Sequence, residues 1–297
     1  MLGEETIAIL GLGLMGGSLA RDLSACGARV LGFDNDASRL RDALAAGAID
    51  AVVSDDLSEL RAASIVVFAV PVDVAPTLLE QAAPFLTTAT LVTDVGSTKL
   101  VIGERAAALG VRARFVGAHP MAGDHRTGFA ASRMGLFTGA RVYLTPTAQS
   151  APAARMQALA LWQAVGASVR WTTAEEHDIE VAFTSHLPHL VAAALARTIA
   201  GAGLGADALG PAGREMTRLA RSSPAMWRAI VATNHEAIVA ALGACAAQLD
   251  AVRATVERRD HDGVARLFTE AGAWSGTPVV APVVAPARKR SANSTAS

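Results

Sequence analysis

Three glycines near the start of the chain have a spacing that indicates a ligand-binding turn. Gly11, Gly13 and Gly16 match the pattern G-x-G-x-x-G between a short apolar run and the start of a helical pattern. In such a turn the first glycine permits a tight bend, the second lets a pyrophosphate approach, and the third lets the helix pack on the strand. The free N–H groups of the helix, which starts near Leu14 and Met15, would face the phosphates. The stretch predicts a dinucleotide-binding site.

A histidine supplies the second candidate for chemistry. His119 ends an apolar run and stands between Ala118 and Pro120. A neutral imidazole, with an ordinary pKa of about 6.5, accepts a proton at neutral pH. A lone histidine is more often a hydrogen-bonded structural residue, so its role depends on the elements around it.

Those elements have the pattern of a parallel sheet. Short apolar runs with turn residues at their carboxyl ends alternate with helical patterns. In an open α/β sheet, ligands bind outside the carboxyl ends of the strands. The runs are Thr6–Leu10, Ala28–Asp34, Ser64–Pro71, Thr90–Ser97 and Arg114–Pro120. The residues expected at the resulting crevice are Pro71, Val72, Asp94, Ser97 and His119.

The end of the second run bears on the choice of cofactor. Asp34 lies at about the distance along the chain at which an acidic residue binds the adenosine ribose. A carboxylate there repels a 2′-phosphate, so Asp34 favours NAD over NADP. Two alternatives stay open: Asp34 caps the following segment, or Arg39 offers a phosphate contact.

The pattern changes after residue 172. A strand at Ala140–Pro146, a helix at about Ala153–Val165 and a strand at Ser168–Thr173 complete a Rossmann-type domain over residues 1–172. Residues 173–276 read as an all-α domain, in which the Ser-Pro pair of Ser222–Trp227 starts a helix. Residues 277–297, rich in Pro, Ala and Ser, are typical of a tail without fixed structure. The fold class is α/β followed by an all-α domain for substrate binding and dimerisation.

The composition excludes several classes of protein. Of 297 residues, 52% are hydrophobic, but polar residues, Pro or Gly interrupt every apolar stretch before the roughly 18 to 20 residues that a bilayer requires. A net charge of −1 offers no footprint for nucleic acid. Cys26 and Cys245 do not make a disulfide framework, which favours the cytoplasm. Helices this apolar all round need more burial than one small domain offers, so we expect a homodimer through the helical domain.

The sequence does not predict a metal site. Asp124, His125, His177 and Asp178 are the candidate ligands. No pair of them has the i, i+4 spacing of a helical zinc motif, and no cysteine joins them.

Five motifs in order carry a resemblance to a known family. They are GLGLMGGSLA at Gly11–Ala20, DVGSTK at Asp94–Lys99, GAHPMAG at Gly117–Gly123, SHLPHLVAAAL at Ser185–Leu195 and TRLARSSPAMWRAI at Thr217–Ile230. Together they resemble the prephenate and arogenate dehydrogenases of tyrosine biosynthesis, over nearly all of the chain from Thr6 to Phe268. Lys99, the only lysine before the tail, falls inside a matched motif.

The resemblance implies oxidative decarboxylation of a cyclohexadienyl substrate with NAD. Hydride leaves ring carbon C4 and CO₂ is lost, which gives 4-hydroxyphenylpyruvate when the substrate is prephenate. By the match, His119 accepts the proton of the C4 hydroxyl, and Ser97 hydrogen-bonds His119 or the nicotinamide amide. Ser97 could equally cap a helix. Lys99 could be a surface residue at a helix start and is left out of the catalytic set.

The resemblance also assigns residues to the substrate. Arg218 would bind a carboxylate, with Glu215 one turn earlier holding its guanidinium. Ser185 and His189 share a helix face at i, i+4, and Pro188 between them would bend the helix. Trp227 would form a wall of the pocket, and His186 would be structural.

One position departs from the family pattern. His125 stands where many relatives carry an acidic residue near the substrate side chain. A carboxylate would favour the ammonium group of arogenate, so His125 favours prephenate.

Two other functions stay open. A β-hydroxyacid dehydrogenase would need a lysine in the helical domain, which has none. A non-catalytic NAD-sensing protein would use the same pocket as a switch.

Overall fold

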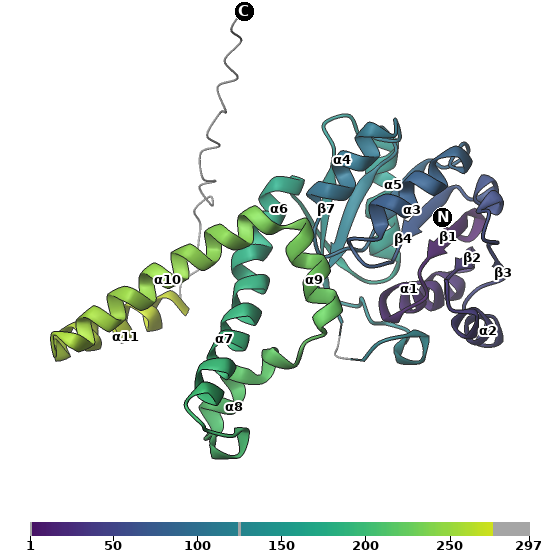
Figure 1. Cartoon of the computed structure of the whole chain (residues 1–297). Coiled ribbons are helices and arrows are strands. Elements are labelled where there is room, and N and C mark those ends of the chain that lie inside the picture. The colour runs from purple at the N-terminus through teal and green to yellow at the C-terminus, as the bar shows by residue number, and fades with distance from the viewer. Residues whose placement is uncertain (1, 124–125, 276–297) are drawn as a thin grey trace, which may run out of the picture.

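The computed structural model describes residues 2–123 and 126–275. The first part of the chain forms a sheet covered by helices, and the second part is helical (Figure 1). The predicted tail over residues 277–297 lies outside the described residues. The strands are β1 Thr6–Leu10, β2 Arg29–Phe33, β3 Ala51–Val52, β4 Ile65–Phe68, β5 Leu91–Asp94, β6 Val116–Pro120, β7 Arg141–Pro146 and β8 Ser168–Trp171.

Five strands form a parallel sheet in the order β3-β2-β1-β4-β5. In the central strand, Ile7 lies opposite Val30 on one side and Ile65 on the other. All five strands run in the same direction, so their carboxyl ends meet at one edge. This confirms the expected α/β fold.

The segment leading into β6, the strand that carries His119, joins this sheet through one parallel bridge, between Val92 and Phe115. β6 then pairs antiparallel with β7, and β7 pairs parallel with β8. The parallel arrangement predicted from the sequence therefore extends as far as β6, and the chain reverses direction at β7.

Helices cover both faces of the sheet. Alternate residues of β1 point to opposite faces, so that Ile7 and Ile9 enter one apolar core and Ala8 and Leu10 enter the other. The first core includes side chains of α1 Leu14–Ala25, α2 Ala37–Ala45 and α5 Pro152–Ala164. The second includes side chains of α3 Ala75–Ala82 and α4 Leu100–Ala108.

The helical part starts with a reciprocal cap at Thr173, whose hydroxyl accepts the N–H of Glu176 while the Glu176 carboxylate accepts the N–H of Thr173. Ser223 caps α9 by accepting the N–H of Met226, as the Ser-Pro pattern predicts. The helices are α6 Ala174–Val181, a π-helical turn Ala182–His186, α7 Leu187–Gly201, α8 Pro211–Thr217, α9 Pro224–Thr233, α10 His235–Glu257 and α11 His261–Ser275. Short 3₁₀ turns lie at Leu2–Glu4, Ser58–Ala62, Ala83–Phe85, Phe129–Ala131, Ala206–Ala208 and Arg218–Arg221.

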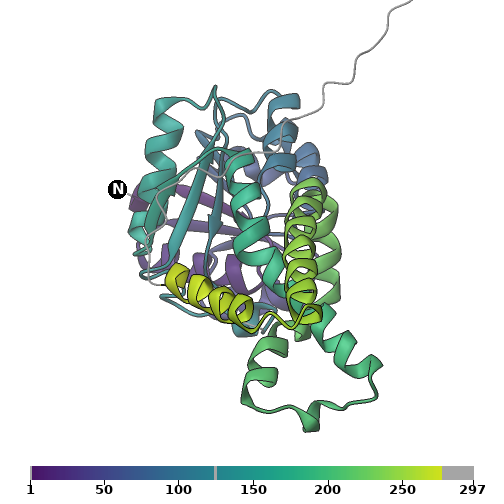
Figure 2. The same ribbon diagram turned by 90° about the vertical axis from the view of Figure 1, so that its left-hand side faces the viewer.

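The helical part buries little of its own apolar surface. Its core cluster of fully buried residues is Ala182, Ile230, Ile238 and Ala241. Figure 1 shows α10 running out from the body with α11 following at its outer end, and Figure 2, viewed from that side, shows the segment around α8 reaching away below the body. Within the described residues, Ala174–Gly201 and α10 are apolar and long enough to span a membrane by length and composition alone.

A buried ion pair ties together the ends of the strands that deliver Ser97 and His119. The Lys99 ammonium contacts the Asp94 carboxylate and donates to the Ala118 carbonyl at 2.8 Å. Asp94 also accepts the N–H groups of Gly96 at 2.8 Å and Ala118 at 3.2 Å. Lys99 is only 1% exposed, so its interpretation as a surface lysine is wrong. Burial lowers the pKa of the Lys99 ammonium, and the adjacent Asp94 carboxylate offsets part of that effect.

We predict that Lys99→Met lowers the free energy of unfolding by about 3–5 kcal/mol, because it leaves the buried Asp94 charge unpaired. Urea denaturation followed by circular dichroism measures the change. The double variant Asp94→Asn/Lys99→Met removes both charges and should lose markedly less. A loss below about 1 kcal/mol in the single variant, the level of an exposed pair, would show that the ion pair is not a structural tie.

Candidate active site

The glycine turn has the shape that a dinucleotide requires. Gly11 has a φ of 101°, and a Cβ there would lie 2.4 Å from the Ala69 carbonyl oxygen. A Cβ on Gly16 would lie 1.9 Å from the Gly11 carbonyl oxygen, so the third glycine is needed for packing. Gly13 precedes α1, and no atom lies within 4 Å of the Cβ it would carry. A dinucleotide fits this turn because the space beside Gly13 is open. The N-terminus of α1, which begins at Leu14, lies next to that space and could bind the phosphates.

Asp34 holds this turn in place. Its carboxylate is buried and accepts the N–H groups of Leu12 at 2.7 Å and Asp36 at 2.9 Å. The Arg39 guanidinium lies 3.4 Å from the same carboxylate. Asp34 thus connects the end of β2 to the glycine turn, and Arg39 is drawn toward the acid.

Three more of the residues predicted to bind the cofactor lie at the carboxyl ends of β4 and β5. Pro71 and Val72 follow β4 and are partly or fully exposed, whereas Asp94 is turned inward to Lys99. Met15 lies in the first turn of α1 and packs against the core.

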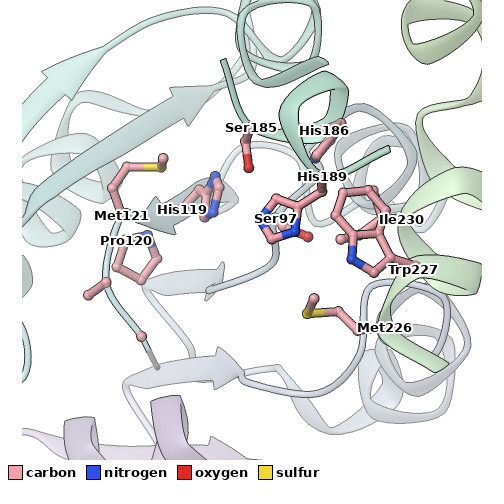
Figure 3. Close-up of a pocket in the computed structure, with 12 residues that line it drawn as sticks. Ser97, His119, Pro120, Met121, Ser185, His186, His189, Met226, Trp227 and Ile230 are labelled. Atoms are coloured by element: carbon pink, nitrogen blue, oxygen red, sulfur yellow. The ribbon is translucent and has the colours of Figure 1, made fainter. Parts of the chain in front are cut away.

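A cavity of about 420 Å³ lies where the sheet edge meets the helical part (Figure 3). The sheet side contributes Ser97, His119, Pro120, Met121, Ala122 and Gly123. The helical side contributes Ser185, His186, His189, Met226, Trp227 and Ile230. Five of the residues predicted from the sequence, Ser97, His119, Ser185, His189 and Trp227, are therefore brought together around one cavity.

His119 is held from behind by a second histidine. Its Nδ1 lies 2.9 Å from His177 Nε2, and His177 Nδ1 lies 2.8 Å from Asp178 Oδ1. Burial lowers the pKa of the His119 imidazole well below its usual value of 6.5, and the charges of the neighbouring His177 and Lys99 act in the same direction. His119 is therefore a neutral imidazole at neutral pH.

The contacts of His177 and Asp178 with His119 and α4 are not predicted from the sequence, in which these two residues were candidates only for a metal site. Asp178 accepts the N–H groups of Lys99 at 2.8 Å and Leu100 at 2.9 Å, so it caps α4 from another helix. The N-cap position of α4 is Lys99, and Ser97 does not cap this helix. The signal in the sequence was the adjacent His-Asp pair one turn after the Thr173 cap.

The π-helical turn opens the helix beside the cavity. It ends at His186, immediately before the Leu187-Pro188 pair, where the sequence predicts a bend. His186, expected to be structural, lines the cavity; burial lowers its pKa to about 4. Its Nδ1 lies 3.3 Å from the Asn234 side-chain nitrogen.

His189 lies one turn further along the helix and is less buried than His186. Its Nδ1 is 2.9 Å from Ser222 Oγ, and its ring centroid lies 4.9 Å from that of Trp227. Burial lowers the pKa of His189, and the positive charge of Arg218 lowers it further.

Arg218 is exposed on a 3₁₀ turn and does not line the cavity. Among the ion pairs of the described residues, none joins it to Glu215, which was expected to hold it. His125 lies outside the described residues.

Comparisons with known proteins agree with this geometry. Residues 19–171 match the family model of the prephenate dehydrogenase nucleotide-binding domain, and residues 173–270 match that of the prephenate dehydrogenase dimerization domain. The chain is 35% identical over 285 residues to a prephenate dehydrogenase of Bacillus subtilis, which covers 90% of this chain and 74% of the relative.

Solved structures are similar over almost their whole length. The prephenate dehydrogenase of A. aeolicus, in complex with hydroxyphenyl propionate and NAD⁺, aligns with a TM-score of 0.85 at 28% identity and covers 91% of this chain and 97% of that one. The arogenate dehydrogenase of Synechocystis aligns with a TM-score of 0.81 at 29% identity, over 91% and 98% of the two chains. With both of its domains matched in order, the chain belongs to the prephenate dehydrogenase family.

Proposed function

We propose that this protein catalyses the NAD-dependent oxidative decarboxylation of prephenate to 4-hydroxyphenylpyruvate. The observation that carries the proposal is the neutral, half-buried His119 in a cavity between the sheet edge and the helical part. The family and the NAD⁺ complex of a relative support it. We further propose domain boundaries at residues 1–172 and 173–276, and a cytoplasmic enzyme.

In this proposal His119 accepts the proton of the substrate's C4 hydroxyl. A base with a lowered pKa keeps its acceptor form at the pH of the cell. The bound nicotinamide supplies the hydride acceptor, and the ring becomes aromatic as its carboxylate leaves as CO₂. The phenolate oxygen so formed takes back the proton from His119, which restores the neutral base.

Ser97 has a positioning role on the opposite side of the base. It lines the same cavity as His119, while the Nδ1 of His119 is occupied by His177. We propose that the Ser97 hydroxyl bonds the nicotinamide amide or the substrate-facing side of the His119 ring. The glycine turn, Asp34 and the ends of β4 and β5 would hold the rest of the cofactor.

The substrate would lie against the helical wall. Ser185 would donate to its side-chain carboxylate, His189 would contact the substrate, and Trp227 would pack against its ring. Arg218 would approach a carboxylate from the open side of the cavity, near His189. His125 would lie near the substrate side chain and favour the keto group of prephenate.

A homodimer through the helical part completes the proposal. Exposed apolar side chains follow one stripe of α10, at spacings of three and seven residues: Val239, Leu242, Leu249 and Val256. An exposed stripe of this length is typical of a protein interface. The match of residues 173–270 to a dimerization-domain model supports dimerisation through this part of the chain.

The function is tested by NADH formation at 340 nm with NAD or NADP crossed against prephenate or arogenate. We expect turnover with NAD and prephenate to exceed that of every other pair. Turnover with arogenate alone would overturn the substrate assignment. Saturable NAD binding without turnover of any pair would indicate a nucleotide sensor.

The pH dependence of kcat tests His119 as the base. Because its pKa is lowered, the acceptor form persists as the pH falls through 6.5, and activity should be lost only at lower pH. His119→Asn should lower kcat by about 10²–10⁴-fold and leave the substrate KM within about threefold. An acid limb above pH 7, or near-normal kcat in the variant, would remove His119 from this role.

Leu249→Asp should convert the dimer to a monomer of 30.4 kDa, because it places a charge in the middle of the apolar stripe. Analytical ultracentrifugation measures the mass. Ala247→Asp adds the same charge on the opposite, exposed face of α10 and should leave the dimer intact. Dissociation in both variants, or in neither, would contradict an interface at this stripe.

A further inference from the structure

An unbroken line of hydrogen bonds runs from the cavity into the protein. His119 Nδ1 bonds His177 Nε2 at 2.9 Å, and His177 Nδ1 bonds Asp178 Oδ1 at 2.8 Å. His177 and Asp178 are buried, with exposures of 0% and 4%. His177 does not line the cavity, so it acts on a ligand only through His119.

The direction of each bond follows from the carboxylate. Asp178 accepts the N–H groups of Lys99 and Leu100 at the N-terminus of α4, and a carboxylate can only accept. His177 must then donate from Nδ1. In a neutral ring its Nε2 is an acceptor, so the His119 Nδ1 must carry a proton. The lone pair of His119 is left on Nε2.

We propose that His177 is a positioning residue that fixes the His119 tautomer with Nε2 as the proton acceptor. The inference deepens the proposed function and rests on it for the role of His119. Within the described residues no hydrogen bond occupies His119 Nε2, so that atom is free for the C4 hydroxyl. Once His119 is protonated, its cation faces the Asp178 carboxylate through the His177 ring, which stabilises the charge that forms during the reaction.

The surroundings of His177 leave Asp178 as its hydrogen-bonding acceptor. Tyr143 from β7 packs edge-on against its ring, with centroids 5.3 Å apart, and directs its hydroxyl to Glu180 at 2.6 Å instead. The remaining titratable groups near it are His119, Lys99, His186 and Asp178. Among these residues, Asp178 is the one whose carboxylate accepts a hydrogen bond from His177. Asp178 therefore sets the direction of the hydrogen bonds from His177 to His119.

The tautomer can be measured directly in the wild-type protein. We expect long-range ¹H–¹⁵N spectra of ¹⁵N-histidine-labelled protein at pH 7.5 to show His119 protonated on Nδ1 and unprotonated on Nε2. The chain has 7 histidines, and His119→Asn and His177→Gln assign the two signals. Protonation of His119 on Nε2 would overturn the proposal.

Two variants of His177 separate positioning from packing. A glutamine amide reaches the position of Nε2 and can accept from His119, whereas an asparagine amide reaches only the position of Nδ1 and keeps the contact with Asp178. We expect His177→Asn to lower kcat by about 100-fold with KM for prephenate within about threefold, and His177→Gln to recover kcat to within about tenfold of wild type. Equal losses in the two variants, or full activity of His177→Asn, would overturn the proposal.

Tyr143→Phe is the matched control, because it removes a polar group from the same cluster without touching the relay. Its kcat should stay near that of wild type, and a loss as large as that of His177→Asn would attribute the effect to packing of the cluster. The spectra require no turnover, so a wild-type protein inactive on prephenate would refute the proposed function and leave the tautomer as a separate result.

Discussion

The Asp178 carboxylate is the interaction on which the rest of the site depends. It accepts two N–H groups at the start of α4 and one from His177, and the backbone carbonyl of the same residue accepts the Asn234 amide. A buried charge is costly unless several donors surround it, and here the donors of the carboxylate come from the start of α4 and from its own helix. This side chain therefore joins the helical part to the sheet-containing part. Replacing it would loosen both the start of α4 and the His177 ring.

A second buried carboxylate works beside it. Asp94 and Lys99 join the ends of β5 and β6, while Asp178 holds the backbone of Lys99 itself. Ser97 and His119 lie on the two segments that this pair ties together, so their separation is set by rigid elements and not by the surface loops. The burial that makes these contacts strong also lowers the pKa of His119. Structure and reactivity at the cavity have the same physical origin.

The amino-acid pattern predicts the structural features that depend on residues close together in the chain. The glycine turn, the apolar strands and the Ser223 cap are all read from residues within a few positions of one another, and all are found. The burial of Lys99 and the relay behind His119 are not predictable in this way, because their partners lie up to 79 residues away. An adjacent His-Asp pair looks the same in a sequence whether it binds a metal, caps a helix or orients another ring. Only the fold selects among these chemistries.

The π-helical turn Ala182–His186 has a consequence for how the chain can vary. Such a turn accommodates one residue more than a regular helix over the same length. Deleting a single residue there would let the helix become regular while the side chains after it keep their orientation. Deleting a residue from the regular part of α6 would instead rotate everything after it by about 100°, so that His189 and the rest of the cavity-facing side of α7 would point elsewhere although no residue of the cavity had changed. Alignments of this segment should therefore accept a one-residue gap within Ala182–His186 far more readily than within α6.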